Sequence, residues 1–108
     1  MTTVEFFSNE DGRIQGFCCS GHSGYAEAGA DIVCASVTTA VQFALSTIVD
    51  VMGERATSKV DSASAEITFK LPAKCDNEDA VQDVLCGMMS TLLWVKEQYP
   101  DYIEVLEV

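Results

Sequence analysis

The sequence predicts an α+β fold in which two helices pack on a mostly antiparallel sheet, with the elements in the order ββαββαβ. Short segments rich in β-branched and aromatic residues flank two longer segments whose apolar residues recur every three or four positions. The chain has 108 residues, of which 48% are hydrophobic. One domain spanning residues 1–108 can therefore form a single packed core without a metal ion or disulfide bonds.

The first two strands are predicted at about 3–7 and 13–19. The first has the sequence TVEFF, and the Asp11-Gly12 pair that follows is a strong hairpin-turn signal. Residues 20–30 (SGHSGYAEAGA) contain three glycines and show no apolar periodicity. We therefore expect a loop in this segment.

The first helix is predicted from Asp31 to just before Gly53. Its apolar stripe consists of Val33, Val37, Ala40, Val41, Ala44, Ile48 and Val51. Because most of the segment is apolar, we expect the helix to be buried on more than one side. Asp31 suits the N-cap position or the first turn of this helix.

Two further strands are predicted at about 55–61 and 64–71, joined near Ser62 and Ala63. A second helix is expected at about 77–98, with the stripe Val81, Leu85, Met88, Leu92 and Val95. Pro100 ends that helix, and residues 102–108 (YIEVLEV) form the last strand.

Composition argues against several classes of function. The chain carries 17 acidic and 6 basic residues, a net charge of −11, which disfavours direct nucleic-acid binding and favours a basic partner. Met1 leads directly into Thr-Thr-Val-Glu, so no signal peptide is indicated, and polar residues interrupt the apolar stretches. We expect a cytoplasmic protein that does not span a membrane.

The five cysteines, at positions 18, 19, 34, 75 and 86, are expected to be reduced in the cytosol. With one histidine and no Cys-x-x-Cys pair, the chain has no recognisable zinc pattern, and we expect neither a metal ion nor a cofactor.

Two residues could carry catalytic chemistry. His22 is the only histidine, so any imidazole chemistry near neutral pH must use it. Cys34 falls in the first turn of the predicted helix, where free backbone N–H groups could stabilise a thiolate and a tetrahedral oxyanion. A surface histidine and a buried, inert cysteine are the alternatives, and the residues alone leave both open.

The segment between His22 and Cys34, which includes Gly24 and Gly29, could fold so that His22 and Cys34 reach hydrogen-bonding distance. Asp31 could then orient the imidazole as a third catalytic member, or it could only cap the helix. Both interpretations remain open, with the cap slightly favoured.

The sequence around these two residues resembles the signature of the ribosomal-processing cysteine protease (Prp) family. The matching strings are Gly21-His22-Ser23-Gly24-Tyr25-Ala26 and Gly29-Ala30-Asp31-Ile32-Val33-Cys34-Ala35-Ser36-Val37-Thr38. Two separated blocks, one with the histidine and one with the cysteine, form a specific signal. In length and element order the resemblance covers nearly the whole chain.

The resemblance implies a cysteine endopeptidase that removes a short N-terminal extension from the twenty-seventh protein of the large ribosomal subunit. It implies that His22 is the base, that Cys34 is the nucleophile, and that Asp31 and the hydroxyl at position 38 are accessory. Many members have Ser where this chain has Thr38. The resemblance also implies a homodimer with a flexible loop over the active site. We expect Gly21, Gly24, Tyr25 and Gly29 to belong to that substrate-binding loop.

Two other functions are compatible with the sequence. A non-catalytic ribosome-assembly adaptor could bind the same basic partner through the acidic surface, and replacing Cys34 would leave it functional. A thiol redox sensor could use Cys34 with Cys18 or Cys19 as the resolving thiol.

Overall fold

The computed structural model describes residues 1–21 and 28–108. Its elements are β1 (Thr2–Ser8), β2 (Ile14–Ser20), α1 (Ala28–Leu45), the π-helical segment η1 (Ser46–Val51), β3 (Thr57–Asp61), β4 (Glu66–Lys70), α2 (Glu78–Gln98) and β5 (Ile103–Glu107). The predicted order ββαββαβ is confirmed, with η1 continuing the first helix.

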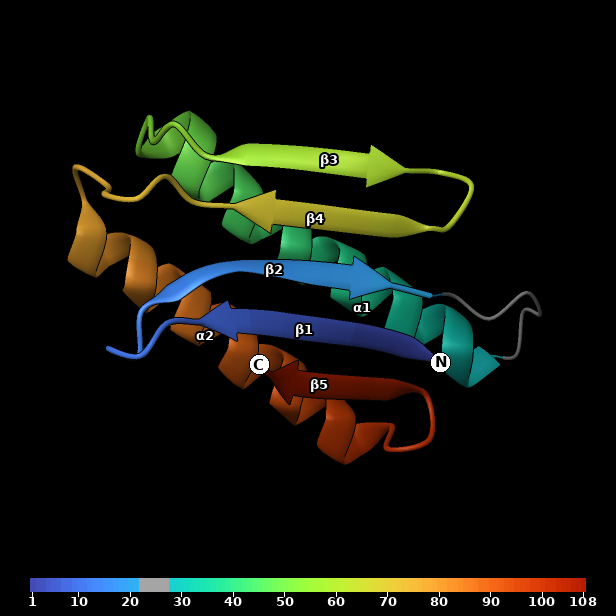
Figure 1. Ribbon diagram of the computed structural model, residues 1–108. Coiled ribbons are helices and arrows are strands. Elements are labelled where there is room, and N and C mark those ends of the chain that lie inside the picture. The colour runs from blue at the N-terminus through green and yellow to red at the C-terminus, as the bar shows by residue number, and fades with distance from the viewer. Residues whose placement is uncertain (22–27) are drawn as a thin grey trace.

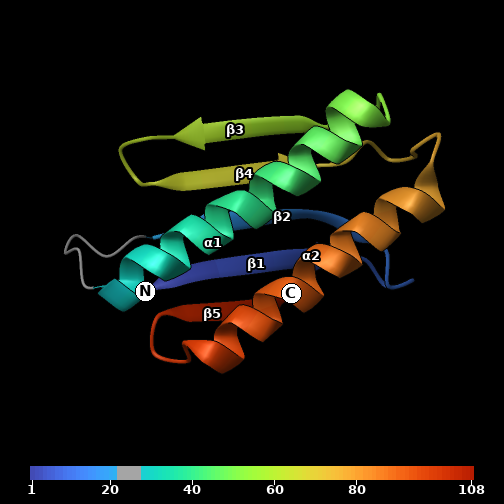
Figure 2. The same ribbon diagram turned by 180° about the vertical axis from the view of Figure 1, so that it is seen from behind.

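The five strands form one sheet in the order β3-β4-β2-β1-β5. The β3–β4, β4–β2 and β2–β1 pairs are antiparallel, and only β1 and β5 run parallel. Both helices lie on one face of this sheet (Figures 1 and 2). The predicted α+β class with a mostly antiparallel sheet is therefore confirmed.

The core lies between the sheet and the two helices. Phe6, Phe17 and Phe69 face each other across β1, β2 and β4, and their ring centroids lie 6.0 and 5.1 Å apart. The predicted stripe of α2 is completely buried against them. This alternation of inward apolar residues fixes the register of the central strands.

The first helix departs from the prediction in two ways. It begins at Ala28 rather than at Asp31, so residues 28–30 are helical rather than part of the expected loop. It is also buried on one side only, because Ile32, Phe43 and Val51 are exposed. Val51 leaves the stripe because the wider turn of η1 rotates it away from the inner face.

The segment Ile32–Val51 is long and apolar enough to cross a membrane by length and composition alone, contrary to expectation. Val33, Val37, Val41 and Ile48 along it are buried in the protein core. The core helix of a soluble protein meets the same criterion, so the segment is only weak evidence for a membrane span.

Polar contacts tie the elements together where α2 begins. The Arg13 guanidinium donates to both carboxylate oxygens of Glu78, at 3.0 and 2.9 Å, and to the Pro72 carbonyl at 2.9 Å. The buried Glu54 carboxylate accepts bonds of 3.1 Å from the amides of Asp76 and Asn77. These contacts join β2, the segment before β3 and the start of α2.

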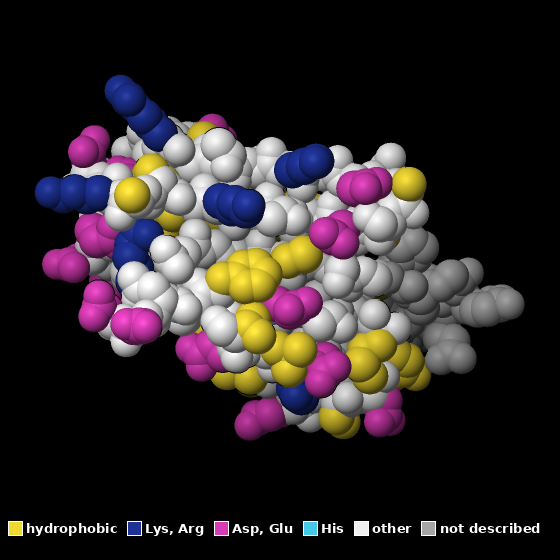
Figure 3. Space-filling view, in the orientation of Figure 1, with side chains coloured by type: hydrophobic (Ala, Val, Ile, Leu, Met, Phe, Trp, Pro, Cys, Tyr) yellow, Lys and Arg dark blue, Asp and Glu magenta, His cyan; other side chains and the backbone are white. Residues whose placement is uncertain are grey.

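The opposite face of the sheet is not covered by the helices. Figure 3 shows this face, with most of its Lys and Arg side chains toward β3 and β4 and acidic side chains scattered over it, including the ends of β3 and β4 that adjoin their turn. On this face the basic side chains are therefore concentrated on one side.

Candidate active site

Cys34 lies on α1 at the end of the molecule where several chain segments meet. The start of β1, the end of β2, the first turns of α1 and the β3–β4 turn all gather there (Figure 1). The thiol is half-buried, and its sulfur lies 3.8 Å from the Oγ1 atom of Thr2 on β1. Cys34 is therefore held against the sheet, with part of its surface still accessible.

A cavity of about 240 Å³ opens beside Cys34. Its lining combines residues of α1 and the first two strands with residues of the β3–β4 hairpin: Thr2, Cys19, Gly21, Cys34, Val37, Thr38, Val60, Asp61, Ser62, Ala65, Glu66 and Ile67. Most of this surface is apolar, and a few carboxylate and hydroxyl groups provide hydrogen-bonding partners. Such a cavity suits an apolar side chain of a peptide beside a nucleophile.

Thr38 lines the same cavity one helical turn after Cys34. Residues four positions apart lie on the same face of a helix, so the hydroxyl and the thiol are neighbours. Of the predicted site residues within the described part of the chain, the structure thus brings Gly21, Cys34 and Thr38 together at one cavity.

The β3–β4 hairpin closes one side of this cavity. The Asp61 carboxylate accepts bonds from the amides of Ala63 and Ser64, at 3.0 and 3.3 Å, which stabilises the turn. Ala65 has a φ of 52°, a left-handed conformation that is uncommon for a residue with a side chain and recurs at functional sites. The sequence predicts the hairpin but not that it lines the same cavity as Cys34.

Gly21 follows the last residue of β2, at a position that only glycine fits well. Its φ is +81°, and a Cβ atom would stand 2.5 Å from the backbone oxygen of Met1. Only glycine satisfies both conditions at little cost. Gly21 therefore fixes where the chain leaves the sheet, one residue before His22.

Four predicted site residues lie wholly or partly outside the described part of the chain. His22, Gly24 and Tyr25 lie outside the described residues. Gly29 and Asp31 belong to the backbone of α1, and the position of the Asp31 side chain is also outside the described part. The roles of His22 as base and Asp31 as orienting residue stay predictions.

The position of Cys34 within its helix corrects one expectation. Because α1 begins at Ala28, Cys34 is its seventh residue rather than a residue of the first turn. Only the first four N–H groups of a helix lack intrahelical partners. The Cys34 amide is therefore not one of the free helix-start donors that were expected to form an oxyanion hole. For the same reason Gly29 is helical rather than part of the loop.

The other thiols differ from Cys34 in environment. Burial raises the pKa of Cys19 to about 11. Burial, together with the hydrogen-bonded Glu54 carboxylate, raises the pKa of Cys75 to about 11. Both are poor nucleophiles at neutral pH, because the thiolate is the reactive form. Within residues 1–21 and 28–108 no group of three or more His, Cys, Asp and Glu side chains is arranged to hold a metal ion.

Comparison with known proteins identifies the family. The family model of the cysteine protease Prp matches residues 1–104. The ribosomal processing cysteine protease Prp of Staphylococcus aureus is 27% identical over 105 residues, which cover 97% of each chain. The Bacillus subtilis protein of the same name is 28% identical over 99 residues, covering 90% of this chain and 88% of its own.

Solved structures share the fold. The crystal structure of an essential ribosomal processing protease Prp from S. aureus with a substrate peptide superposes with a TM-score of 0.89, at 24% identity and full coverage of both chains. The structure of the S. aureus protease with a covalently linked product peptide gives 0.85, also at 24% identity and full coverage. With its family model matched over nearly its whole length, the chain belongs to the Prp family of cysteine proteases.

Proposed function

We propose that this protease removes the N-terminal extension of the twenty-seventh protein of the bacterial large ribosomal subunit, with Cys34 as nucleophile and His22 as base. One observation carries the proposal. Cys34 is a half-buried thiol on the wall of an apolar cavity formed by α1, the first two strands and the β3–β4 hairpin. The relatives from S. aureus and B. subtilis are named for ribosomal processing, which supports the substrate class.

The reaction follows the chemistry of acyl transfer. His22 takes the Cys34 proton, and the thiolate attacks the carbonyl carbon of the scissile bond. The tetrahedral intermediate collapses to a thioester, and the amine of the mature protein leaves with a proton from the imidazolium. Water then hydrolyses the thioester, which releases the extension and restores the thiol. The Thr38 hydroxyl has an accessory role beside Cys34, and Asp31 either orients His22 or stabilises the helix.

The charge of the cavity rim suits a basic substrate. Asp61 and Glu66 lie on the hairpin side of the cavity, and the whole chain carries a net charge of −11. Ribosomal proteins are basic, so attraction to these carboxylates speeds encounter and orients the peptide. The residues of the glycine-rich loop, including Gly24 and Tyr25, complete the substrate site in this proposal.

The direct test is cleavage of the extended ribosomal protein by the purified protease. Wild-type protein should release the extension as a single fragment, and Cys34→Ala and His22→Ala should not. Cys86→Ala is the matched control, because Cys86 is an exposed thiol on the other helix and should leave cleavage unchanged. The protein without its extension should stay intact.

The same experiment separates protease from adaptor. An adaptor would bind the extended protein without cutting it, and Cys34→Ala would bind equally well. Binding without cleavage by wild-type protein would therefore refute the proposed function and favour the adaptor.

The redox alternative rests on the thiols near Cys34. Cys19 lines the same cavity as Cys34 and is therefore a candidate disulfide partner for it. The high pKa of the buried Cys19 thiol slows its attack on an oxidised Cys34. Mapping of disulfides after mild peroxide tests this alternative, because a sensor requires a disulfide from Cys34 to Cys18 or Cys19, and we expect none.

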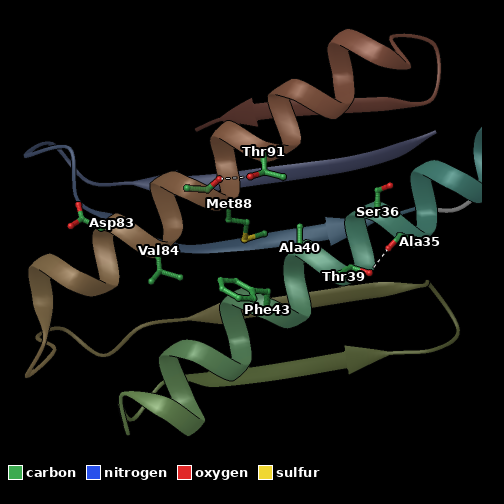
Figure 4. Close-up of a pocket in the computed structure, with 10 residues that line it drawn as sticks. Ala35, Ser36, Thr39, Ala40, Phe43, Asp83, Val84, Met88 and Thr91 are labelled. Carbon is green, nitrogen blue, oxygen red and sulfur yellow. Dashed lines mark hydrogen bonds between the residues drawn. The ribbon is translucent and has the colours of Figure 1, made fainter.

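A homodimer is the second part of the proposal. A groove between α1 and α2 encloses about 830 Å³ and is lined by Ala35, Ser36, Thr39, Ala40, Phe43, Asp83, Val84, Gly87, Met88 and Thr91 (Figure 4). Phe43 projects from α1 into this groove with 69% of its surface exposed. Exposed apolar surface of this kind is typical of a subunit interface, and we infer that a second copy covers it.

Solution mass tests the dimer. Phe43→Glu should convert the dimer to a monomer in light scattering, because a charge would be buried in the contact. Val60→Glu is the control, since Val60 is also 69% exposed but lies on β3. A monomeric wild-type protein at all concentrations would contradict the dimer.

Processing of a ribosomal precursor would place the protein in the cytoplasm, which stays a prediction.

A further inference from the structure

The hydroxyl of Thr2 is buried beside the sulfur of Cys34. Thr2 is only 4% exposed, and its Oγ1 atom lies 3.8 Å from the Cys34 Sγ atom. A buried hydroxyl without a hydrogen-bond partner is costly. Within the described residues, the Cys34 sulfur is the hydrogen-bond partner of this hydroxyl, so the contact offsets the cost of burying it.

The backbone holds Thr2 firmly in place. β1 is paired on both sides, antiparallel with β2 and parallel with β5, and the Thr2 amide donates to the Tyr102 carbonyl at 3.0 Å. The preceding carbonyl, that of Met1, lies against Gly21. The first two residues of the chain therefore lie against both the residue before His22 and the Cys34 side chain.

We propose that Thr2 is a positioning residue whose hydroxyl fixes the Cys34 sulfur and donates a hydrogen bond to its thiolate. The inference rests on the proposed role of Cys34 as nucleophile. In the thiol form either atom can act as donor. Once Cys34 loses its proton, only the Thr2 O–H can donate, so the contact strengthens in the charged form. The interaction thus favours the reactive state of the nucleophile.

The test compares Thr2→Val with Thr2→Ser. Valine keeps the branched shape and the burial but lacks the hydroxyl, whereas serine keeps the hydroxyl. The readout is the rate of Cys34 alkylation by iodoacetamide across pH, followed by peptide mapping so that the other cysteines do not interfere. Kinetic constants for cleavage of the extended peptide provide a second readout.

Thr2→Val should slow alkylation of Cys34 at neutral pH about two-fold, because fewer thiolates form but each is somewhat more nucleophilic. The pH of half-maximal rate should rise by about half a unit. Thr2→Ser should restore most of the wild-type profile. In the cleavage assay, Thr2→Val should lower kcat and leave KM unchanged.

Thr68→Val is the matched control. The Thr68 hydroxyl makes the same 3.8 Å contact with a thiol, that of Cys18, but away from the active-site cavity. Its replacement should leave the Cys34 profile unchanged. A folded Thr2→Val protein with the wild-type alkylation profile would overturn the inference, as would a Thr2→Ser protein that is as slow as Thr2→Val. If Thr2→Val does not fold, the Thr2→Ser and Thr2→Ala pair decides by the same criterion.

The two proposals fail separately. A wild-type protein that cleaves the peptide, with a Thr2→Val profile like wild type, would refute the role of Thr2 alone. A protein that does not cleave the peptide, but whose Cys34 reactivity depends on the Thr2 hydroxyl, would refute the proposed function and retain the contact.

Discussion

Replacing Gly16 with alanine should strongly destabilise the protein. Gly16 is buried on β2 opposite Lys70 of β4, and an added Cβ atom would stand 2.2 Å from the backbone oxygen of Phe69. A carbon atom normally approaches a carbonyl oxygen no closer than about 3.3 Å. The two strands would therefore have to separate by about 1 Å at this point.

That separation would break backbone hydrogen bonds between β2 and β4 next to the core. The amide of Leu71 donates to the carbonyl of Gln15 at 2.9 Å, and a further ångström would exceed hydrogen-bonding distance. The stacked Phe17 and Phe69 rings would also move apart. Loss of one or two buried backbone bonds, with looser ring packing, should reduce the free energy of unfolding by about 2–4 kcal/mol.

Chemical denaturation with urea, followed by circular dichroism, measures this change. Gly87→Ala is the matched control, because a Cβ atom at Gly87 meets nothing within 4 Å and the residue lies inside α2. The same substitution there should raise the free energy of unfolding by about 0.5–1 kcal/mol. Repeating both measurements at several protein concentrations separates folding from subunit association. A Gly16→Ala protein as stable as wild type would refute the reasoning.

Three further predictions concern pH, thiol reactivity and the site. The Arg13 hydrogen bond lowers the pKa of the Glu78 carboxyl. This pair therefore stabilises the fold when the pH is above the ordinary carboxyl pKa. The stabilisation is lost as the pH falls through the lowered pKa of Glu78. Denaturation between neutral and acid pH should show a smaller loss in Arg13→Met than in wild type; equal losses would contradict the pairing. Near neutral pH, thiols with a raised pKa react slowly with iodoacetamide. Peptide maps should therefore show labelling of Cys34 and Cys86, with Cys19 and Cys75 spared. Fast labelling of Cys75 in the folded protein would argue against its buried environment. Gly21→Ala should reduce kcat/KM by about ten-fold or more, because the clash with Met1 displaces the chain one residue before His22; unchanged kinetics would show that the geometry at Gly21 does not position the base.

Regular periodicity explains which elements could be predicted. The α2 stripe of Val81, Leu85, Met88, Leu92 and Val95 is buried throughout, because one uninterrupted α-helix keeps residues at these spacings on one face. The strands were predictable from their alternation and β-branched content. The first helix was less predictable at both ends. Its first residues are small and lack an apolar stripe, and its last turn is a π-helix that shifts Val51 outward.

The candidate site shows a different limit. The two blocks around His22 and Cys34 could be recognised from the sequence alone, but the surroundings of Cys34 could not. Thr2 and the β3–β4 hairpin lie about thirty residues on either side of it, and only strand order and register bring them to the same cavity. No local pattern at Thr2, Val60 or Ala65 distinguishes these residues from those of any other strand or turn.

Capture of the covalent intermediate shows whether Cys34 is the nucleophile. The protease is mixed with the extended substrate peptide, quenched in acid within the first turnover, and mapped by mass spectrometry. We expect a thioester that joins the carboxyl end of the released extension to Cys34, absent from Cys34→Ala and retained in Cys86→Ala. Turnover by Cys34→Ala, or an acyl group found on another residue of the wild-type protein, would contradict it.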